Sequence, residues 1–547
     1  MPATDVFTER YSDLLNGSYD CVDRIVLNGY VRMLQSGGGF RQWWRSVHGT
    51  LDGLDDTHLM RFAGRFARRV WAGAKRQNIP VLQKKRDEEI AETVKELCPA
   101  DPNFRGVFCI VVQRMPNSVW GVVVYSNGNL HFKRKQPHPY VNHYSFHIQD
   151  PDWGHICITV CPHAPFNVQV ILNGHEYVAR QARQQDVSFT QQGNCFTHSA
   201  NLAGLERLAD TLRSPSAIGP LREVCERWLY SACLCYLFPV VEQQELGLRY
   251  DWSVYQLEYS RNLLFTRGRE MEEVFQSVID RTRAALDART VKTLFGRKHR
   301  PAWHRPDKCR KSQVVVETPT YDLTVFKVLF GLLQLKIYTK GEHLLRIEAT
   351  VHNAKREFRP YGLAQFANIA NALRSMVERF CEVLHSVEAC WVTDEMMEQL
   401  PGPSQVGSSR TAGIDLNRPR MRAVLSALLP LSARYRRFRV EQLAKTVQSA
   451  LGQQYSSRQA SYDLKKLRGK GLVQKLEGTR RYTCPPDSLR IIMAVVTLRE
   501  RVLKPLLAGM TTRRRGRPSK NQDQIDKHYQ ALRQRLEMLL TDLGIAA

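Results

Sequence analysis

The chain of 547 residues has no hydrophobic run long enough to cross a membrane. Its longest apolar stretch, residues 228–241, is 14 residues long and contains Pro239, whereas a transmembrane helix needs about 20 residues. Residues 1–11 are acidic and polar and have no apolar core of the kind found in signal peptides. These absences predict a cytoplasmic protein with no membrane partner.

Cysteine pairs and phosphate-binding loops are also missing. The thirteen cysteines are scattered singly along the chain, and an odd number in so large a protein favours a reducing compartment. The glycine-rich stretch "QSGGGF", which begins at Gln35, lacks the Lys-Ser/Thr pair that completes a P-loop. The sequence therefore gives no reason to expect ATP as a cofactor.

The chain has far fewer acidic than basic residues. The chain has 53 Asp and Glu against 79 Lys and Arg, which gives a formal net charge of +26. Such an excess attracts polyanions and makes their binding depend strongly on salt. This balance favours nucleic acid as the partner, either duplex DNA or RNA and single-stranded DNA, although a merely basic surface would give the same totals.

The length predicts several domains, and the order of patterns along the chain predicts a multidomain α+β protein. "DDTHLMRFAGRFARRVWAGAKRQN" has helical spacing of its apolar residues, with Asp56 expected as the N-cap, and neighbouring strands favour a parallel layer. The predicted segments are an α/β N-terminal region (1–105), an antiparallel β-rich domain (106–200), a helical region (201–310), a palm-like β segment with a helix (311–400), a linker (401–418), a compact helical and hairpin domain (419–505), and a basic arm with an amphipathic helix (506–547).

The stretch "SSRQASYDLKKLRGKGLVQKLEGTRRYTC" predicts a helix and a basic hairpin. We expect Ser457 to cap this helix, on which Ala460, Leu464 and Leu467 form one buried stripe. Two further helices precede it. Three helices followed by a basic hairpin resemble the winged-helix domain of the MarR type, over about 80 of the 547 residues.

That resemblance implies a third helix in the major groove of duplex DNA and a hairpin along the phosphate backbone. The side chains assigned to the groove are Arg458, Gln459, Tyr462 and Lys465, with Lys466 further round the helix. The side chains assigned to phosphates are Lys470, Arg480 and Arg481. Winged helices also serve as protein-docking modules, which is the alternative.

Behind this domain, "TTRRRGRPSK" resembles the core of an AT-hook in Arg515, Gly516, Arg517 and Pro518. The glycine lets an extended backbone enter a narrow minor groove, whose negative potential attracts the flanking arginines. A solvated basic tether is the alternative. The amphipathic helix that follows could dock on its own chain or form a homodimer through Tyr529, Leu532, Leu536 and Leu539.

The strand pair "LKIYTKGEHLLRIEATV", residues 335–351, resembles the palm-like strands of rolling-circle replication initiators. The resemblance implies Tyr338 as a nucleophile toward DNA and Lys336 and Lys340 as phosphate-stabilising groups. It also implies Glu342 or Glu348 as ligands of a divalent metal, Mg²⁺ or Mn²⁺. The His-hydrophobic-His pair of that family is missing, because "HYSFHI" spaces its histidines by four. A basic strand face that lies on nucleic acid is the alternative.

Two other groups have residue types that could bind metal. Strand alternation places four zinc-type ligands on one face, but their spacing matches no standard finger and favours structural packing: His155, Cys157, Cys161 and His163. A set of N-terminal carboxylates resembles the metal sites of PIN and flap nucleases, although helix capping accounts for two of them, Asp56 and Asp87. The full set is Asp20, Asp23, Asp55, Asp56, Asp87, Glu88 and Glu89.

The chain as a whole resembles a group of uncharacterised bacterial proteins that combine an "NG" β segment, an "LRIE"-like strand and a C-terminal winged helix. We expect a nucleoid-associated protein that anchors to duplex DNA in a mobile-element or replication context. The alternatives are a metal-dependent nickase, a ribonucleoprotein subunit that targets DNA and uses the rest of the chain for RNA, and a plain regulator.

Overall fold

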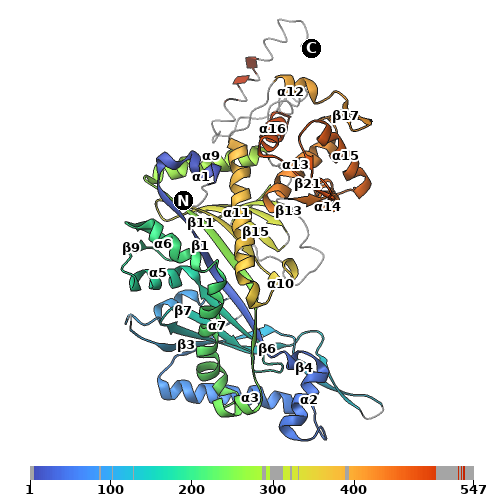
Figure 1. Ribbon diagram of the computed structural model, residues 1–547. Helices are drawn as coiled ribbons and strands as arrows, with labels where there is room; N and C mark the ends of the chain where they lie inside the picture. Colours follow the sequence, from blue (N-terminus) through green and yellow to red (C-terminus); the bar gives the residue numbers. More distant parts are fainter. Residues whose placement is uncertain are drawn as a thin grey trace. The chain divides into compact units, whose positions relative to one another are not determined.

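The computed structural model describes residues 5–85, 88–101, 103–126, 129–285, 291–295, 312–320, 323–330, 332–388, 394–435, 437–499, 528, 531–532 and 534–535. The chain divides into two compact units (Figure 1). The body unit comprises Ser12–Met271 and Leu332–Val377. The C-terminal unit comprises Met1–Tyr11, Glu272–Gly331 and Glu378–Ala547.

A large mixed sheet forms the centre of the body unit, with the strand order β15-β16-β11-β1-β8-β7-β6-β3-β2. Neighbouring strands are antiparallel except β2 and β3, which are parallel. The strands are β1 (Leu15–Tyr30), β2 (Val81–Gln83), β3 (Gly106–Pro116), β6 (Tyr140–Asp150), β7 (Gly154–Val160), β8 (Val168–Asn173), β11 (Asp251–Phe265), β15 (Leu333–Lys340) and β16 (Leu344–Val351). Two hairpins accompany the sheet, namely β4 (Trp120–Val124) with β5 (Leu130–Arg134) and β9 (Phe189–Gln191) with β10 (Phe196–Ser199).

The sheet confirms the predicted α+β class and corrects one expectation. The first strand, β1, does not belong to a parallel layer, because both of its neighbours, β8 and β11, are antiparallel to it. Alternation of side chains identifies a strand but does not say which strand pairs with it. The partner β11 begins more than 200 residues after β1 ends, and only the tertiary structure selects it.

Helix α3 (Asp56–Gln77) packs on the body core through Phe62 and Phe66. Their rings lie 5.3 Å from Phe166 and 4.9 Å from Tyr144. The N-cap is Asp55, one residue before the predicted Asp56, because the Asp55 carboxylate accepts the His58 amide at 3.2 Å. The other body helices are α2 (Gly37–His48), α4 (Ala91–Glu96), α5 (Gly174–Gln184), α6 (Leu202–Thr211), α7 (Ile218–Trp228), α8 (Val240–Glu245), α10 (Ala354–Glu357) and the first part of α11 (Phe366–Glu388).

The C-terminal unit contains a module in the order α13-β19-α14-α15-β20-β21-α16 (Figure 1), in which the three short strands form one antiparallel sheet, β19-β21-β20. Its elements are α13 (Pro419–Arg434), β19 (Phe438–Arg439), α14 (Val440–Leu451), α15 (Ser457–Gly469), β20 (Gln474–Lys475), β21 (Arg481–Thr483) and α16 (Pro486–Thr497). The unit also contains α1 (Val6–Arg10), most of α9 (Gly268–Ala285), α12 (Asp394–Gln399), β12 (Val291–Phe295), β13 (Ser312–Thr320), β14 (Leu323–Phe330), β17 (Ser404–Val406) and β18 (Ser409–Thr411).

Residues 401–418, predicted to be a linker, contain the β17–β18 hairpin and pack against this module. Ile414 is 1% exposed and lies in the same hydrophobic core as Leu428 and Leu464. Gly413 lies so close to the backbone of Pro401 that an added Cβ would be 1.8 Å from the carbonyl oxygen. Glycine here therefore permits a close backbone approach rather than flexibility. In the part of the chain that is described, no helix combines the length and hydropathy of a membrane span.

Candidate functional sites

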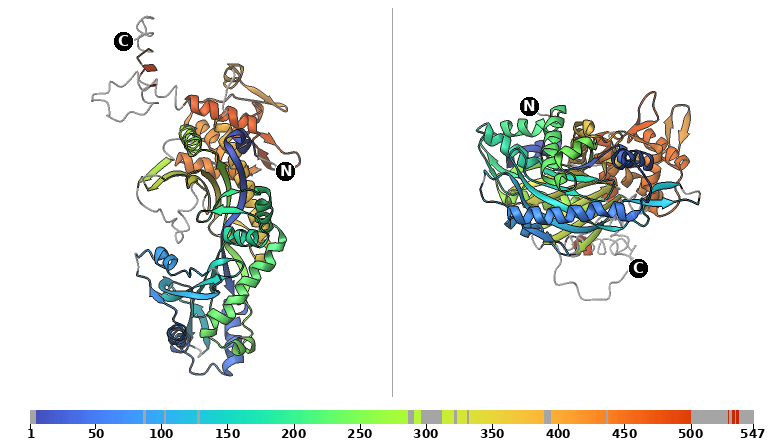
Figure 2. Two further views of the ribbon diagram at one scale, coloured as in Figure 1. Left: turned by 90° about the vertical axis from the view of Figure 1, so that its left-hand side faces the viewer. Right: turned by 90° about the horizontal axis from the view of Figure 1, so that it is seen from below.

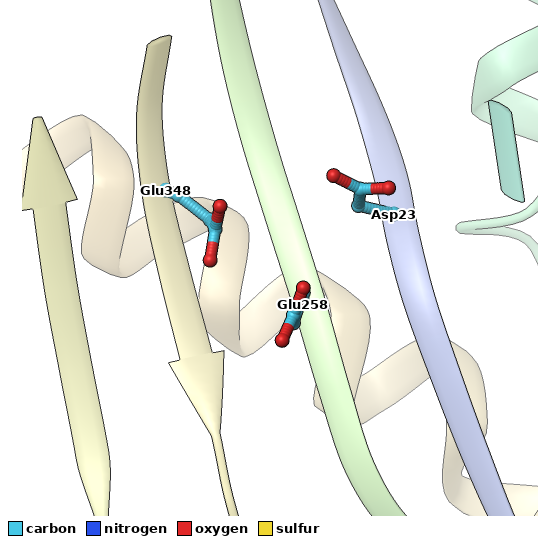
Figure 3. A group of neighbouring side chains, drawn as sticks. All are labelled: Asp23, Glu258 and Glu348. Atoms are coloured by element: carbon cyan, nitrogen blue, oxygen red, sulfur yellow. The ribbon is translucent and has the colours of Figure 1, made fainter. Parts of the chain in front are cut away.

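Three neighbouring strands of the body sheet place three carboxylates together. Asp23 on β1, Glu258 on β11 and Glu348 on β16 each have one carboxylate oxygen that lies within 4.8 Å of the corresponding oxygens of the other two (Figure 3). Asp23 lies where the β1–β11 register is irregular, between Val22 and Ile25. We call these three residues the carboxylate group.

Arg346 and Asn194 hold the carboxylate of Asp23. Arg346 Nη1 donates to Asp23 Oδ2 at 2.8 Å, and Asn194 Nδ2 lies 2.8 Å from each carboxylate oxygen. Burial alone would raise the pKa of Asp23, but His175 and the Arg346 guanidinium hold that pKa well below its usual range. His175 Nδ1 is 3.4 Å from Asp23 Oδ1, and burial lowers the pKa of this imidazole. The permanent positive charge beside Asp23 is therefore that of Arg346.

Glu348 has three donors of its own. It accepts from Lys336 Nζ at 2.6 Å, Tyr338 Oη at 2.8 Å and Thr350 Oγ1 at 2.8 Å. Burial opposes the charge of Glu348, yet Lys336 outweighs it and keeps the pKa of this carboxyl low. Burial and the charge of Glu348 together raise the pKa of Tyr338 well above its usual value. The phenol is therefore protonated at neutral pH and donates its proton toward Glu348.

Of the three carboxylates, Glu258 has the fewest positive charges and hydrogen-bond donors to offset the cost of burying its own charge. It accepts a hydrogen bond from Gln256 Nε2 at 2.8 Å, while Lys336 and Arg346 contact the other two carboxylates. Burial and the charge of Glu348 raise its pKa to about 7. Within the carboxylate group, Glu258 is therefore the residue that retains a proton up to near neutral pH. Since carboxylate oxygens are also the ligands that Mg²⁺ and Mn²⁺ prefer, a divalent cation could take the place of that proton.

The structure brings together only part of the predicted rolling-circle site. Lys336, Tyr338 and Glu348 meet as expected. Lys340 is partly buried, and burial and Arg346 lower its pKa. Glu342 lies in the turn after β15 with its side chain 91% exposed, outside the carboxylate group. The sequence reasoning missed Glu258 and Arg346. On β16, whose sequence is LLRIEATV, the two charged residues Arg346 and Glu348 alternate within an otherwise largely apolar strand, which was a usable signal for Arg346. The polar sequence of β11 gave no such signal for Glu258.

The predicted N-terminal carboxylate set is dispersed. Asp20 forms a separate pair with Arg261, at 2.8 Å from both Nε and Nη2, and accepts from Tyr259 Oη at 2.9 Å. Asp55 caps α3, and Asp56 accepts the Val122 amide at 2.8 Å. Glu88 accepts the Lys85 amide at 2.9 Å, and Asp87 lies outside the described residues. Of the described residues in that predicted set, Asp23 is the one that belongs to the carboxylate group.

The four predicted zinc-type ligands do not gather in one place. Strand β7 ends at Val160, so Cys161 and His163 lie beyond it. His155 Nε2 lies 2.9 Å from His147 Nδ1 instead. Burial raises the pKa of both Cys157 and Cys161 to about 11 and lowers that of His163 to about 4. These thiols are protonated at neutral pH, and the His and Cys side chains of the described residues form no group of metal ligands.

A second candidate site lies on α15 and the β20–β21 hairpin of the C-terminal unit. The buried stripe of Ala460, Leu464 and Leu467 is as predicted, with each residue 0% exposed. The cap is Ser456 rather than Ser457, because its Oγ accepts the Gln459 amide at 3.2 Å. Gln459 Oε1 in turn accepts the Ser456 amide at 2.8 Å. This capping box engages the side chain that was assigned to base contacts.

The other predicted DNA-contacting residues divide into exposed and engaged side chains. Lys466 is only 7% exposed, with its Nζ 5.0 Å from the centre of the Tyr462 ring, so it does not project from the helix as expected. Lys470 Nζ donates to the Gln399 carbonyl. The side chains that reach solvent are Arg458, Tyr462, Arg480 and Arg481, with Lys465 partly exposed.

Asp463 anchors α15 from its buried side. It is 0% exposed and accepts from Arg420 Nη2 at 2.9 Å and from Tyr455 Oη at 2.9 Å. Burial and the charge of Asp463 raise the pKa of Tyr455 beyond its usual range. These bonds tie the helix to α13 and hold its exposed face in one orientation.

Two predicted features fall largely beyond the described residues. The AT-hook-like segment Arg515, Gly516, Arg517 and Pro518 lies outside them entirely. Of the predicted dimerisation helix, Leu532 is described as helical and 43% exposed, whereas Tyr529, Leu536 and Leu539 are not described.

Comparisons with known proteins give the chain no family. No protein-family model and no curated protein matches it. Among solved structures, the di-domain ARO/CYC BexL from the BE-7585A biosynthetic pathway aligns with 54% of this chain and 91% of its own. The sequence identity is 12% and the TM-score is 0.13, so this likeness supports no statement about fold or activity.

Proposed function

We propose that the protein binds duplex DNA through the module formed by residues 419–499. One observation carries the proposal. Arg458, Lys465, Arg480 and Arg481 have no acidic partner among the described residues, and they lie on one helix and the hairpin that follows it. Cations without partners favour a polyanionic ligand. The element order helix-strand-helix-helix-strand-strand also supports the winged-helix resemblance.

The side chains take different roles in this proposal. Arg458 and Tyr462 read base edges from the exposed face of α15, because a guanidinium can bond a guanine with two donors. Lys465, Arg480 and Arg481 neutralise phosphates. Gln459 and Lys466 act within the module, as a cap and as part of the Tyr462 contact. The Arg515–Pro518 arm would add a minor-groove contact, and the C-terminal helix a homodimer. Nucleoid association in a mobile-element or replication context is part of the same proposal.

The variant with Lys465, Arg480 and Arg481 all changed to Ala is expected to bind duplex DNA ten- to a hundredfold more weakly near 0.1 M salt. Loss of three phosphate contacts should also reduce the slope of log K against log salt by about 2–3. Fluorescence anisotropy with a labelled duplex, using full-length protein over a salt series, measures both quantities.

A matched variant removes three exposed cations of the body unit by Arg24→Ala, Arg249→Ala and Arg359→Ala. We expect it to retain the affinity and salt slope of the unmodified protein. Equal losses in the two variants would mean that net charge, rather than this surface, determines duplex binding, and the proposal would then be wrong.

The carboxylate group supports a second candidate function, metal-dependent nicking of DNA. The specific observation is that three carboxylates lie within 4.8 Å of one another beside Tyr338, whose phenol already donates to Glu348. In this candidate Tyr338 Oη would attack a phosphodiester phosphorus, and the P–O bond to one sugar oxygen would break. The phenolic proton would pass by way of Glu348 to that leaving oxygen, and Asp23 and Glu258 would be the ligands that hold Mg²⁺ or Mn²⁺.

If this candidate is right, the protein nicks supercoiled plasmid in Mn²⁺ or Mg²⁺ and not in EDTA. Tyr338→Phe removes the nucleophile and Glu258→Gln removes a ligand, so each should reduce nicking at least a hundredfold. Glu342→Gln alters an exposed carboxylate outside the group and should have no effect. Nicking that survives Tyr338→Phe, or no nicking in either metal, would show that this candidate is wrong and that the carboxylate group has a structural role.

A further inference from the structure

Beyond its first residue, Asp56, helix α3 of the body unit contains no acidic side chain, and its solvent face is basic. After Asp56 the chain has no Asp or Glu until Asp87, while α3 alone contributes six cations. Figure 2 shows α3, the long blue helix of its right-hand view, extending along the body unit. A helix that packs in a core through one face usually alternates acids and bases on the other, which limits its attraction for polyanions. This helix does not.

The six cations differ in their surroundings. Arg65 lies over the rings of Phe62 and Phe238, at 5.4 and 5.6 Å, and Arg69 Nη1 donates to the Leu237 carbonyl at 3.3 Å. These two pack onto the body. The other four are exposed and form no ion pair within the described chain, namely Arg61, Arg68, Lys75 and Arg76.

Helical geometry aligns three of the exposed cations. Arg61, Arg68 and Lys75 recur every seven residues, so they lie on one face and are spaced about 10 Å along the axis. Trp71 is on the same side, with 43% of its surface exposed, and Met60 is 60% exposed. A helix face that only contacts water does not need large apolar side chains beside its unpaired cations, so their presence favours a ligand. We call Arg61, Arg68, Trp71 and Lys75 the α3 face.

A second basic and aromatic feature adjoins the start of α3. The β4–β5 hairpin is fixed there by the bond from the Val122 amide to Asp56 and by the Lys135–Asp56 ion pair. On this hairpin Lys133 Nζ is 4.8 Å from the centre of the Tyr125 ring, and Tyr125 is 40% exposed. The same combination of side chains therefore extends beyond the helix.

We propose that the α3 face binds a single strand of nucleic acid, with Arg61, Arg68 and Lys75 each on a phosphate along its backbone and Trp71 stacked on a base. Cations that follow a backbone beside an aromatic platform are the recurring chemistry of single-strand recognition. A duplex would not offer the exposed base face that Trp71 requires. The face has no group placed to select a 2′-hydroxyl, so RNA and DNA strands should bind alike. This site goes beyond the duplex-binding function proposed for residues 419–499.

The test uses full-length protein with labelled oligo(dT) and oligo(rU) of 20 nucleotides, followed by anisotropy over a salt series. Changing Arg61, Arg68 and Lys75 together to Ala should weaken binding of both strands at least tenfold near 0.1 M salt. It should also lower the salt slope by about 2, as expected for three contacts to a single strand. Trp71→Ala should cost about tenfold, and Trp71→Phe, which retains a stacking ring, should restore most of that loss.

Two controls separate this site from the duplex-binding surface. The Arg24, Arg249 and Arg359 triple alanine variant should bind single strands like the unmodified protein. The α3 variant should keep its affinity for duplex DNA, and the Lys465, Arg480 and Arg481 variant should keep its affinity for single strands. Unchanged binding of single strands by the α3 variant, or an equal loss in the control triple, would overturn the proposal. Equal loss of single-strand and duplex binding by the α3 variant would overturn it too.

Discussion

Arg346→Met is expected to lower the free energy of unfolding of the body unit by about 3–5 kcal/mol. Arg346 is 0% exposed and donates to Asp23 at 2.8 Å, to Asn262 at 2.7 Å and to the Asn194 carbonyl at 2.7 Å. Methionine fills much of the same volume but supplies no donor. The variant therefore leaves the charge of Asp23 buried without its cation, which costs far more than an exposed ion pair is worth.

Urea denaturation of the full chain, followed by circular dichroism, measures this effect on the transition of the body unit. Arg24→Met makes the same substitution at an exposed arginine of the same strand system and should change stability by less than about 0.5 kcal/mol. Adding Asp23→Asn to Arg346→Met removes the unpaired charge, so the double variant should be more stable than Arg346→Met alone. A loss below about 1 kcal/mol in Arg346→Met would show that the network is not a structural anchor.

Glu258→Gln is expected to stabilise the protein above pH 7 by about 2–3 kcal/mol relative to the unmodified chain. The pKa of Glu258 is raised from 4.5 to about 7 in the folded protein, because burial and Glu348 disfavour its charge. Between these two values the folded state keeps a proton that the unfolded state releases. This contribution to stability is therefore complete below about pH 4.5, declines as the pH rises toward 7, and is absent above that pH.

The measurement is the difference in unfolding free energy between the two proteins from pH 4.5 to 8, in EDTA. A difference is needed because His147 and His163, whose pKa values fall to about 4, give the opposite slope in part of this range. Glu342→Gln, at an exposed carboxylate, should leave the profile unchanged. A difference between Glu258→Gln and the unmodified protein that does not vary with pH would contradict the raised pKa of Glu258.

Local patterns predicted the C-terminal module more completely than the body. The stripe of Ala460, Leu464 and Leu467 is buried as expected, because helical periodicity depends only on neighbours along the chain. Both predicted caps are one residue late, at Ser457 and Asp56, since the cap is set by backbone angles that several adjacent polar residues could adopt. Nothing in the sequence around Asp463 predicted that this residue would be buried. Its hydrogen-bond partners, Arg420 and Tyr455, both lie outside its own helix.

The sequence by itself determined the class of the protein's structure, its excess of cations, the buried stripe of α15 and the absence of an acid from most of α3. These features depend only on the composition of the chain and on the spacing of residues that are close together in the sequence. Only the tertiary structure decided which strands are neighbours and therefore which charges meet. Asp23, Glu258 and Glu348 come from distant parts of the chain and meet on three neighbouring strands. The antiparallel register brings Glu348 close to Glu258, and the charge of Glu348 helps to raise the pKa of Glu258. The register between strands depends on which faces of all the strands are buried together, and no single segment of the sequence contains that information.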